Sequence, residues 1–301
     1  MNYKHFKSYH ELIQILQKRN LIIRDEQSVL AFLKQVHYYR LSAYFTPFQY
    51  SKQSNKKDIF KDGVSFENIK DLYQFDCKLK ELIFSYLQEL EIILRAQISH
   101  IHTEKFGPFG YLENDKSLRR KLFKKNSNLY NVFMNKVKKE KERSDEVFIK
   151  HIKEKYVIND LPLWALVEIL SFGSISKFYE LMQKDEQVKI LQYFKISEVK
   201  IDTFSNWLQT LSYIRNICAH HSRLWNRSLT IKFKTTSACN FLSADVKNDK
   251  FFYALSVLAL ILKDGKIKNS FINLLHMYPK IDTEAMGIPN NWQILSPWNE
   301  L

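Results

Sequence analysis

The sequence predicts an all-α protein, built as a bundle of many helices. Only 6 glycines and 6 prolines occur in 301 residues, which is low for this length and disfavours sheets joined by many tight turns. Hydrophobic residues make up 45% of the chain, enough for a sizeable core. Apolar residues recur every three or four positions along most of the chain, which is the period of helices buried on one face. We find no Walker-type loop and no dinucleotide-binding fingerprint.

An N-terminal helical segment is expected over residues 1–64. Ser8 and Glu11 have the spacing of a capping box, in which two side chains satisfy free backbone N–H groups at the start of a helix. They begin a helix expected over residues 8–20, and another helix is expected over residues 25–36.

An aromatic cluster with the sequence HYYRLSAY occupies residues 37–44 of this segment. Aromatic rings around an arginine can stack on nucleic-acid bases. They can equally pack the N-terminal helices onto the rest of the protein, since large aromatic side chains dominate core packing. We favour packing over direct RNA contact for these tyrosines.

The central part of the chain, residues 65–235, is expected to form the main helical core, beginning with one long helix over residues 65–105. Residues 236–301 should add two C-terminal helices and an irregular tail. The apolar run over residues 251–262 is too short to span a bilayer, so we predict a buried helix and no membrane partner. The three segments are expected to form one compact unit.

One amphipathic helix is expected over residues 203–222. Arg215 projects to the middle of its apolar stripe, where an unpaired charge is costly. Arg215 should therefore be buried against a carboxylate, or face a subunit interface or an anion. Glu168 is the first-choice partner, and Glu89 or Glu91 on the long helix is the alternative.

A polar stripe on the same helix carries Asn216 and His220, which are four residues apart and therefore neighbours. Arg223 and Arg227 extend this stripe if the helix continues that far. Arg215 and His220 form an Arg-x4-His pattern, which occurs often by chance. Without further information, these two residues would be interpreted as holding the helix bundle together.

Arg95 and His100 repeat the Arg-x4-His spacing on the long helix. They could form a second half of an active site. Because Glu91 lies one turn before Arg95, an ordinary ion pair within the helix is the favoured interpretation.

Residues 116–143 are the most basic part of the chain, with 11 lysines and arginines against two glutamates. We expect a pair of basic helices here. They could contact the backbone of RNA or form a solvated lysine face, and the two interpretations are about even. The candidate RNA-binding residues of this segment are Arg119, Arg120, Lys121, Lys124, Lys125, Lys136, Lys138 and Lys139.

Three stretches together carry a resemblance to a known family. Residues 215–227 fit the motif of HEPN ribonucleases and, in their extended form, resemble the Abi family of abortive-infection proteins. Residues 37–44 and 163–179 match the same family in order and spacing. The resemblance covers roughly residues 10–235. It implies a bundle of HEPN type with extra N- and C-terminal helices, and a toxin-like protein of bacterial phage defence.

The resemblance also implies a chemistry. HEPN enzymes are metal-independent endoribonucleases in which the 2′-hydroxyl of RNA attacks the phosphate and a 2′,3′-cyclic phosphate is left. Arg215 would then hold the phosphate, His220 would be the acid or base, and Asn216 would orient His220 or the phosphate. Arg223 and Arg227 could grip flanking phosphates. These enzymes usually build one site from two motif helices, so a homodimer is expected.

Composition agrees with a nucleic-acid partner. The net charge of +14 favours a polyanion, and nucleic acid before a membrane. Cys77, Cys218 and Cys239 lack the spacing of a metal site, and no carboxylate cluster suits Mg²⁺, so no metal or other cofactor is expected. Widely separated cysteines and an N-terminus without an apolar signal core predict a cytoplasmic protein, and the resemblance to the Abi family implies a bacterial one.

Three functions therefore remain open at this point, one of which is a protein-binding regulator that has no affinity for RNA at moderate salt. The favoured one is the ribonuclease, with RNA as its substrate and an inhibitory or structured RNA on the basic surface to hold it in check. The alternative is a non-catalytic RNA-binding protein, in which Arg215 and His220 anchor a structured RNA.

Overall fold

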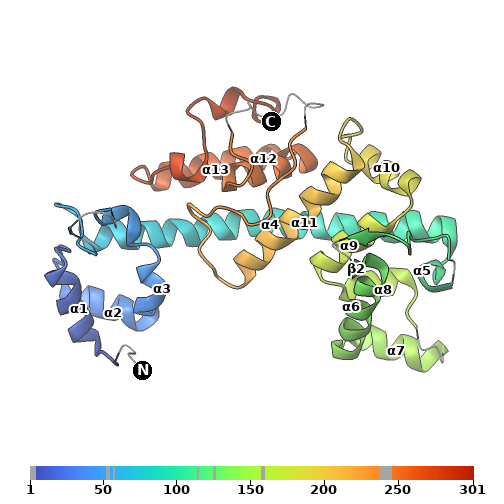
Figure 1. Cartoon of the computed structure of the whole chain (residues 1–301), viewed down its shortest axis with the longest axis horizontal. Coiled ribbons are helices and arrows are strands. Elements are labelled where there is room, and N and C mark those ends of the chain that lie inside the picture. Colours follow the sequence, from blue (N-terminus) through green and yellow to red (C-terminus); the bar gives the residue numbers. More distant parts are fainter. Residues whose placement is uncertain are drawn as a thin grey trace. The chain divides into compact units, whose positions relative to one another are not determined.

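The computed structural model describes residues 5–51, 55–56, 58–113, 115–124, 127–156, 160–236 and 246–301. The fold is all-α and is built from many packed helices, as the sequence predicts (Figure 1). Within the described ranges, the named strands are β1 (Phe123–Lys124) and β2 (Ser127–Asn128), which pair antiparallel.

The chain divides into two compact units. One comprises Met1–Lys80 with Asn273–Ile281, and the other comprises Glu81–Ile272 with Asp282–Leu301. The division into three sequence segments stays a prediction. All residues that carry the argument about function below belong to the second unit.

The first unit begins with the helices that the sequence predicts. Its elements are α1 (Tyr9–Lys18), α2 (Glu26–Gln35), α3 (Tyr38–Ser42), the 3-10 turn η1 (Thr46–Phe48) and the first part of α4 (Phe66–Phe106) (Figure 1). The capping box is confirmed. The hydroxyl of Ser8 accepts a hydrogen bond from the Glu11 N–H, and the Glu11 carboxylate accepts one from the Ser8 N–H. α1 packs against α2.

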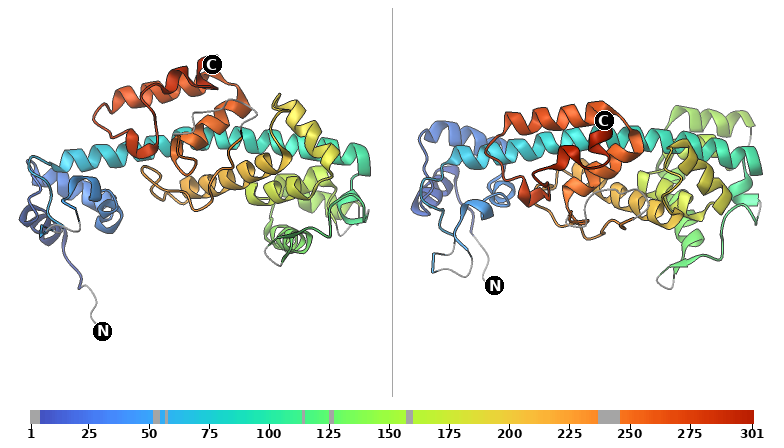
Figure 2. Two further views of the ribbon diagram at one scale, coloured as in Figure 1. Left: turned by 45° about the horizontal axis from the view of Figure 1, so that its top comes forward. Right: turned by 90° about the horizontal axis from the view of Figure 1, so that it is seen from above.

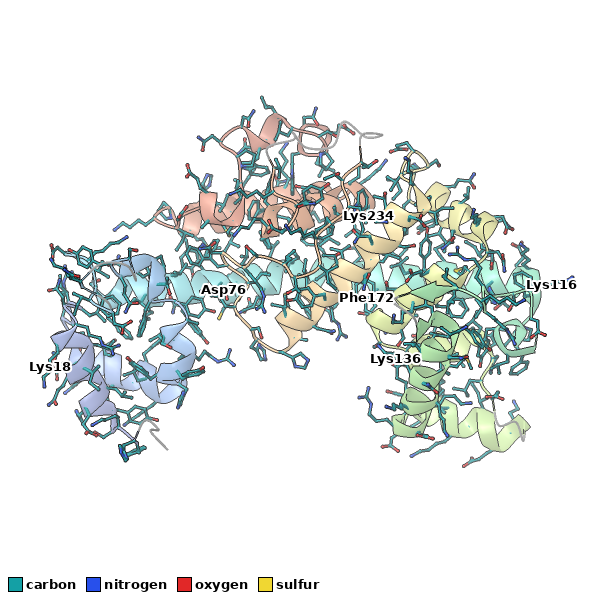
Figure 3. The ribbon with its side chains drawn as sticks, in the orientation of Figure 1. Lys18, Asp76, Lys116, Lys136, Phe172 and Lys234 are labelled. Carbon is teal, nitrogen blue, oxygen red and sulfur yellow. The ribbon has the colours of Figure 1, made fainter. Side chains whose placement is uncertain are left out.

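Tyr44 is the buried anchor of the aromatic cluster. Its hydroxyl donates a 2.6 Å hydrogen bond to Asp76 of α4, which also accepts from Lys80 at 2.9 Å (Figure 3 labels Asp76). Burial, and then the Asp76 carboxylate, raise the pKa of Tyr44 above its ordinary value. The predicted packing role is thus confirmed for Tyr44. Tyr39 of the same cluster is 80% exposed and does not have this role.

The long helix α4 runs from Phe66 to Phe106, close to the predicted bounds. It ends at Gly107, whose φ of +79° is the left-handed conformation that terminates many helices. The part of α4 from Glu81 onward belongs to the second unit.

The other helices of the second unit are α5 (Gly110–Glu113), α6 (Leu129–Arg143), α7 (Val147–Tyr156), α8 (Leu163–Ile169), α9 (Phe172–Leu181), α10 (Lys184–Tyr193), α11 (Ile201–Ala219), α12 (Phe251–Leu262) and α13 (Gly265–Met277), which continues into the first unit. The 3-10 turns η2 (Glu284–Met286), η3 (Trp292–Ile294) and η4 (Trp298–Glu300) form its C-terminal tail. α9 packs on both α11 and α6. α11 lies against the part of α4 in the same unit (Figure 2).

The predicted pair of basic helices is wrong in its first half. The segment before α6 forms turns and the short hairpin of β1 and β2, and only Leu129–Arg143 is helical. The physical reason is the polar stretch that ends at Asn128. The Asn128 side chain caps α6 by accepting from the Asn131 N–H and also donates to the Arg120 carbonyl, so it favours a turn over a continuing helix.

The motif helix α11 is shorter than predicted. It ends at Ala219, and His221 has a left-handed φ of +53°. The Ser222 N–H donates to the Ile217 carbonyl and the His221 N–H to the Cys218 carbonyl, each at 3.0 Å. This pair of bonds is a Schellman motif, which closes a helix and usually has glycine at the left-handed position. The expected helix through Ser222 is therefore wrong, because this motif stops it.

Candidate functional site

Arg215 meets its carboxylate partner on α4. Its Nε lies 3.5 Å from Oε2 of Glu91, and its guanidinium lies over the Phe84 ring at 5.9 Å from the ring centre. The expectation of Glu168 as the partner is wrong, because Glu168 is exposed on α8. The alternative on the long helix is confirmed for Glu91.

Arg215 is less buried than the sequence predicts. Its side chain is 31% exposed, whereas that of Glu91 is 5% exposed. Its Nε has no hydrogen-bond partner among the described residues, so the attraction to Glu91 is that of an ion pair. The guanidinium therefore sits at the surface, attached along one edge to a buried negative charge.

Glu91 is shared between the two Arg-x4-His patterns. Its Oε1 accepts a 2.5 Å hydrogen bond from Nη2 of Arg95, which also donates to the Leu170 carbonyl at 2.8 Å. The ion pair predicted within the helix is thus confirmed. Its other oxygen faces Arg215. One buried carboxylate therefore fixes an arginine from each of two helices, which satisfies the rule that buried charges are paired.

Asn216 and His220 lie beyond Arg215 at the end of α11. Both are exposed, and the His220 N–H donates to the Asn216 carbonyl at 3.0 Å. His220 is the C-cap residue. The end of α11 therefore places the imidazole at the surface, one turn after Asn216.

Arg223 and Arg227 do not continue the polar stripe of the helix, because α11 has ended before them. They lie half-buried on the loop that follows, where Arg227 donates to the Arg223 carbonyl at 3.0 Å. Leu224 and Trp225 anchor this loop, with 1% and 2% of their surfaces exposed. The Trp225 Nε1 donates to the Asp282 carbonyl at 3.2 Å. The expected helical placement of both arginines is wrong, but both stay near the motif.

The candidate RNA-binding residues of the basic segment separate into two kinds. Lys136, Lys138 and Lys139 are exposed on α6, and Lys121 is exposed before the hairpin (Figure 3 labels Lys136). By contrast, Arg119 and Arg120 are half-buried and bound within the fold. Arg119 donates to the Glu180 carbonyl; Arg120 donates to the Leu112 carbonyl and pairs with Asp115. Lys124 belongs to β1, and Lys125 lies outside the described residues.

Arg95 and His100, which form the second Arg-x4-His pattern, line a surface cleft. Arg95, Ser99, His100, Thr103 and Glu104 of α4 face Trp164, Val167 and Glu168 of α8 across a volume of about 510 Å³. His100 is exposed there, and Trp164 is 52% exposed. Whether His100 belongs to an active-site half stays a prediction.

The described residues contain no group of three or more histidine, cysteine or acidic side chains arranged to hold a metal ion. Over the same ranges, no helix combines the length and apolar character needed to cross a bilayer.

Comparison with known proteins identifies the family. A family model described as Abi-like protein matches residues 31–226. The chain belongs to the Abi-like protein family. The matched range contains the aromatic cluster, α8, α9 and all of α11, and it ends one residue before Arg227. Membership indicates a role in abortive infection, a defence against phage. Neither the curated proteins nor the solved structures contain a significant match.

Sequence reasoning about this Abi-like protein missed two features of the site. The sharing of Glu91 by Arg95 and Arg215 had a signal, since Glu91 was the expected partner of Arg95 and an alternative partner of Arg215. The cleft had a weaker signal in the sequence. Trp164 and Glu168 are four residues apart on one short helix, so they share a face of that helix. Which face of α8 remains open to solvent depended on how α8 packs.

Proposed function

We propose that this Abi-like protein is a metal-independent endoribonuclease of HEPN type, acting on RNA at Arg215, Asn216 and His220. In this reaction the 2′-hydroxyl loses its proton and attacks the adjacent phosphorus. The bond to the 5′-oxygen breaks, and that oxygen takes up a proton. The products are a 2′,3′-cyclic phosphate and a 5′-hydroxyl, and no other reactant is consumed.

The main support for this proposal is that Arg215 is paired with Glu91 on one side and is partly exposed on the other. Its Nε edge faces Glu91 at 3.5 Å, while 31% of the side chain is exposed. A guanidinium has five N–H donors, and two edges of its fork can each bind an oxyanion. With one edge directed to Glu91, the other suits the charge that develops on the phosphate oxygens.

In this proposal, His220 moves the protons. It lies five residues after Arg215, which corresponds to a rise of about 7–8 Å along a helix, a span that an arginine side chain and a phosphate can bridge. Histidine changes its charge near neutral pH, so it can accept the hydroxyl proton or donate one to the leaving oxygen. Exposed Asn216 on the same helix can orient either group.

A second copy of the chain completes the proposal. The reaction needs both a base and an acid, and one His220 can supply only one of them at a time. Two copies with their α11 ends together would supply two histidines and two arginines. We therefore propose a homodimer, in accordance with the resemblance to HEPN enzymes.

The test compares the wild type with His220→Ala and Arg215→Ala on a mixed RNA pool in EDTA, after removal of co-purified nucleic acid. We expect cleavage with cyclic phosphate ends by the wild type and a loss of at least about 100-fold in each variant. His276→Ala is a matched control, because His276 lies, like His220, at the end of a helix but belongs to α13, which carries no residue of the proposed site. Cleavage by His220→Ala at the wild-type rate would refute the assignment.

The alternative is a non-catalytic RNA-binding protein, which the exposed lysines of α6 favour. Lys136, Lys138 and Lys139 place three positive charges within a little over one helical turn. In this case the wild type retains RNA and cuts none of it, and His220→Ala retains RNA equally. Protein with neither cleavage nor RNA retention at moderate salt would contradict both functions.

A further inference from the structure

The cleft between α4 and α8 is separate from the Arg215 site, and it has an unusual lining for a surface hollow. Trp164 presents a half-exposed indole ring, at 52% exposure, although every other tryptophan of the chain is buried at 6% exposure or less. A large aromatic side chain left open to water beside a cleft is a typical stacking surface for a planar ligand.

Two carboxylates, Glu104 and Glu168, lie among the polar side chains of the cleft, which also include Arg95, Ser99, His100 and Thr103. Glu168 has no hydrogen-bond or ion-pair partner among the described residues, and Glu104 forms a long 3.4 Å ion pair with exposed Lys189. Ionised carboxylates only accept hydrogen bonds. A ligand that suits this cleft therefore combines a flat aromatic face with N–H or O–H donors at its edge.

The direction of α8 places these groups together. The Leu163 N–H donates to the Pro108 carbonyl, beyond the end of α4, while the Leu170 carbonyl accepts from Arg95, further back on α4. α8 thus runs antiparallel to α4. Trp164 and Glu168 are one turn apart on α8, so a ring stacked on Trp164 turns its edge toward Glu168.

Arg95 ties the cleft to the proposed site of cleavage. It lines the cleft and binds Oε1 of Glu91, whose Oε2 faces Arg215. A single carboxylate therefore separates the cleft from the arginine proposed to hold the phosphate. A nucleotide next to that phosphate is in reach of the cleft.

We propose that this cleft is a nucleoside-binding subsite that takes an RNA base whose edge carries N–H donors, guanine in preference to uracil. Guanine presents two adjacent N–H donors to one carboxylate. Uracil presents a single N–H between two carbonyl oxygens, which a carboxylate repels. Recognition of a base of the RNA substrate by this subsite rests on the function proposed above. Binding of a nucleotide to the subsite does not, because it can be measured without any cleavage.

Trp164 makes the test direct, because quenching by acrylamide reports on it while the other four tryptophans are buried. The probes are guanosine and uridine 5′-monophosphates and single-stranded tetranucleotides of each base, with the His220→Ala protein. We expect guanine to protect Trp164 with an affinity at least about tenfold above that of uracil. Protection by the tetranucleotide but not by the mononucleotide assigns the cleft to a strand, and protection by both assigns it to the nucleoside itself.

Variants separate stacking from edge recognition, with binding measured by calorimetry. Trp164→Ala should weaken guanine binding about tenfold, as loss of one stacked base does, and Trp164→Phe should restore most of it. Glu168→Gln should reduce the preference for guanine over uracil to about threefold or less. Tyr193→Ala and Glu146→Gln are matched controls, since both residues are exposed elsewhere in the second unit.

Some results overturn the inference. Equal protection by the two bases, or none by either, removes the subsite. Protection of Trp164 that grows with protein concentration alone makes the cleft a contact between copies of the chain. Cleavage of RNA without protection of Trp164 would refute the subsite and leave the ribonuclease standing. Guanine binding to the wild type without any RNA cleavage would support the subsite and contradict the ribonuclease.

Discussion

Replacing Glu91 by glutamine removes the one negative charge that Arg95 and Arg215 share. At 3.5 Å, the Coulomb attraction between Glu91 and Arg215 is about 5 kcal/mol for an effective dielectric constant of about 20. Water around Arg215, which is 31% exposed, reduces this value. Breaking a buried pair by removing one partner typically costs about 3–5 kcal/mol.

Glutamine keeps an oxygen that can accept from Arg95, so part of this loss is recovered. We therefore expect the free energy of unfolding to fall by about 2–3 kcal/mol, and Tm by about 5–10 °C for a unit of this size. RNA cleavage should fall by about 100-fold, because Arg215 loses the contact that fixes its position.

Thermal unfolding followed by circular dichroism measures the first effect. Glu89→Gln is the matched control. Glu89 is exposed on the same helix, and its replacement by glutamine removes the same charge from the protein. A double-mutant cycle with Arg215→Gln isolates the coupling of the two side chains. If Glu91→Gln unfolds at the same temperature as Glu89→Gln, the shared carboxylate does not hold the site together and the reasoning is refuted.

Two further expectations concern pH and salt. Burial raises the pKa of Tyr111 and Tyr179 above the ordinary value near 10, so their contribution to stability is complete below pH 10 and is lost as pH rises further. Above pH 10, urea unfolding should show a decline that approaches about 1.4 kcal/mol per tyrosine and pH unit. In Tyr179→Phe this decline should be less steep by one tyrosine, and an unchanged slope in that variant would contradict the reasoning. Reversing Lys136, Lys138 and Lys139 to glutamate should weaken RNA binding and reduce its salt slope by about 2, since each contact to a single strand contributes about 0.7. An unchanged affinity would mean that α6 presents only a solvated face.

Local rules were sufficient for many helix boundaries. The capping box at Ser8 and Glu11 and the long apolar period of α4 specify their helices without help from distant residues. The rules were insufficient where short polar residues compete with helix formation. The segment before α6 becomes a hairpin, and α11 stops at a Schellman motif with His221 where glycine is usual.

The candidate site shows the same limit. Arg215 and its need for a carboxylate followed from helical periodicity, since a charge in an apolar stripe must be paired. Which carboxylate meets it did not follow. Glu91 and Glu168 both lie among apolar residues in the sequence, and only the packing of α8 and α11 on α4 buries the first and exposes the second.

The sequence by itself determined the all-α class, the family and the residues of the Arg-x4-His motif, because periodicity, composition and a contiguous motif are properties of neighbours along the chain. Only the tertiary structure decided that Arg95 and Arg215 share Glu91 and that Trp164 opens onto a cleft. Pairing and exposure depend on how helices distant in sequence pack together. That packing arises from the summed burial of many side chains, and no short stretch of sequence encodes it.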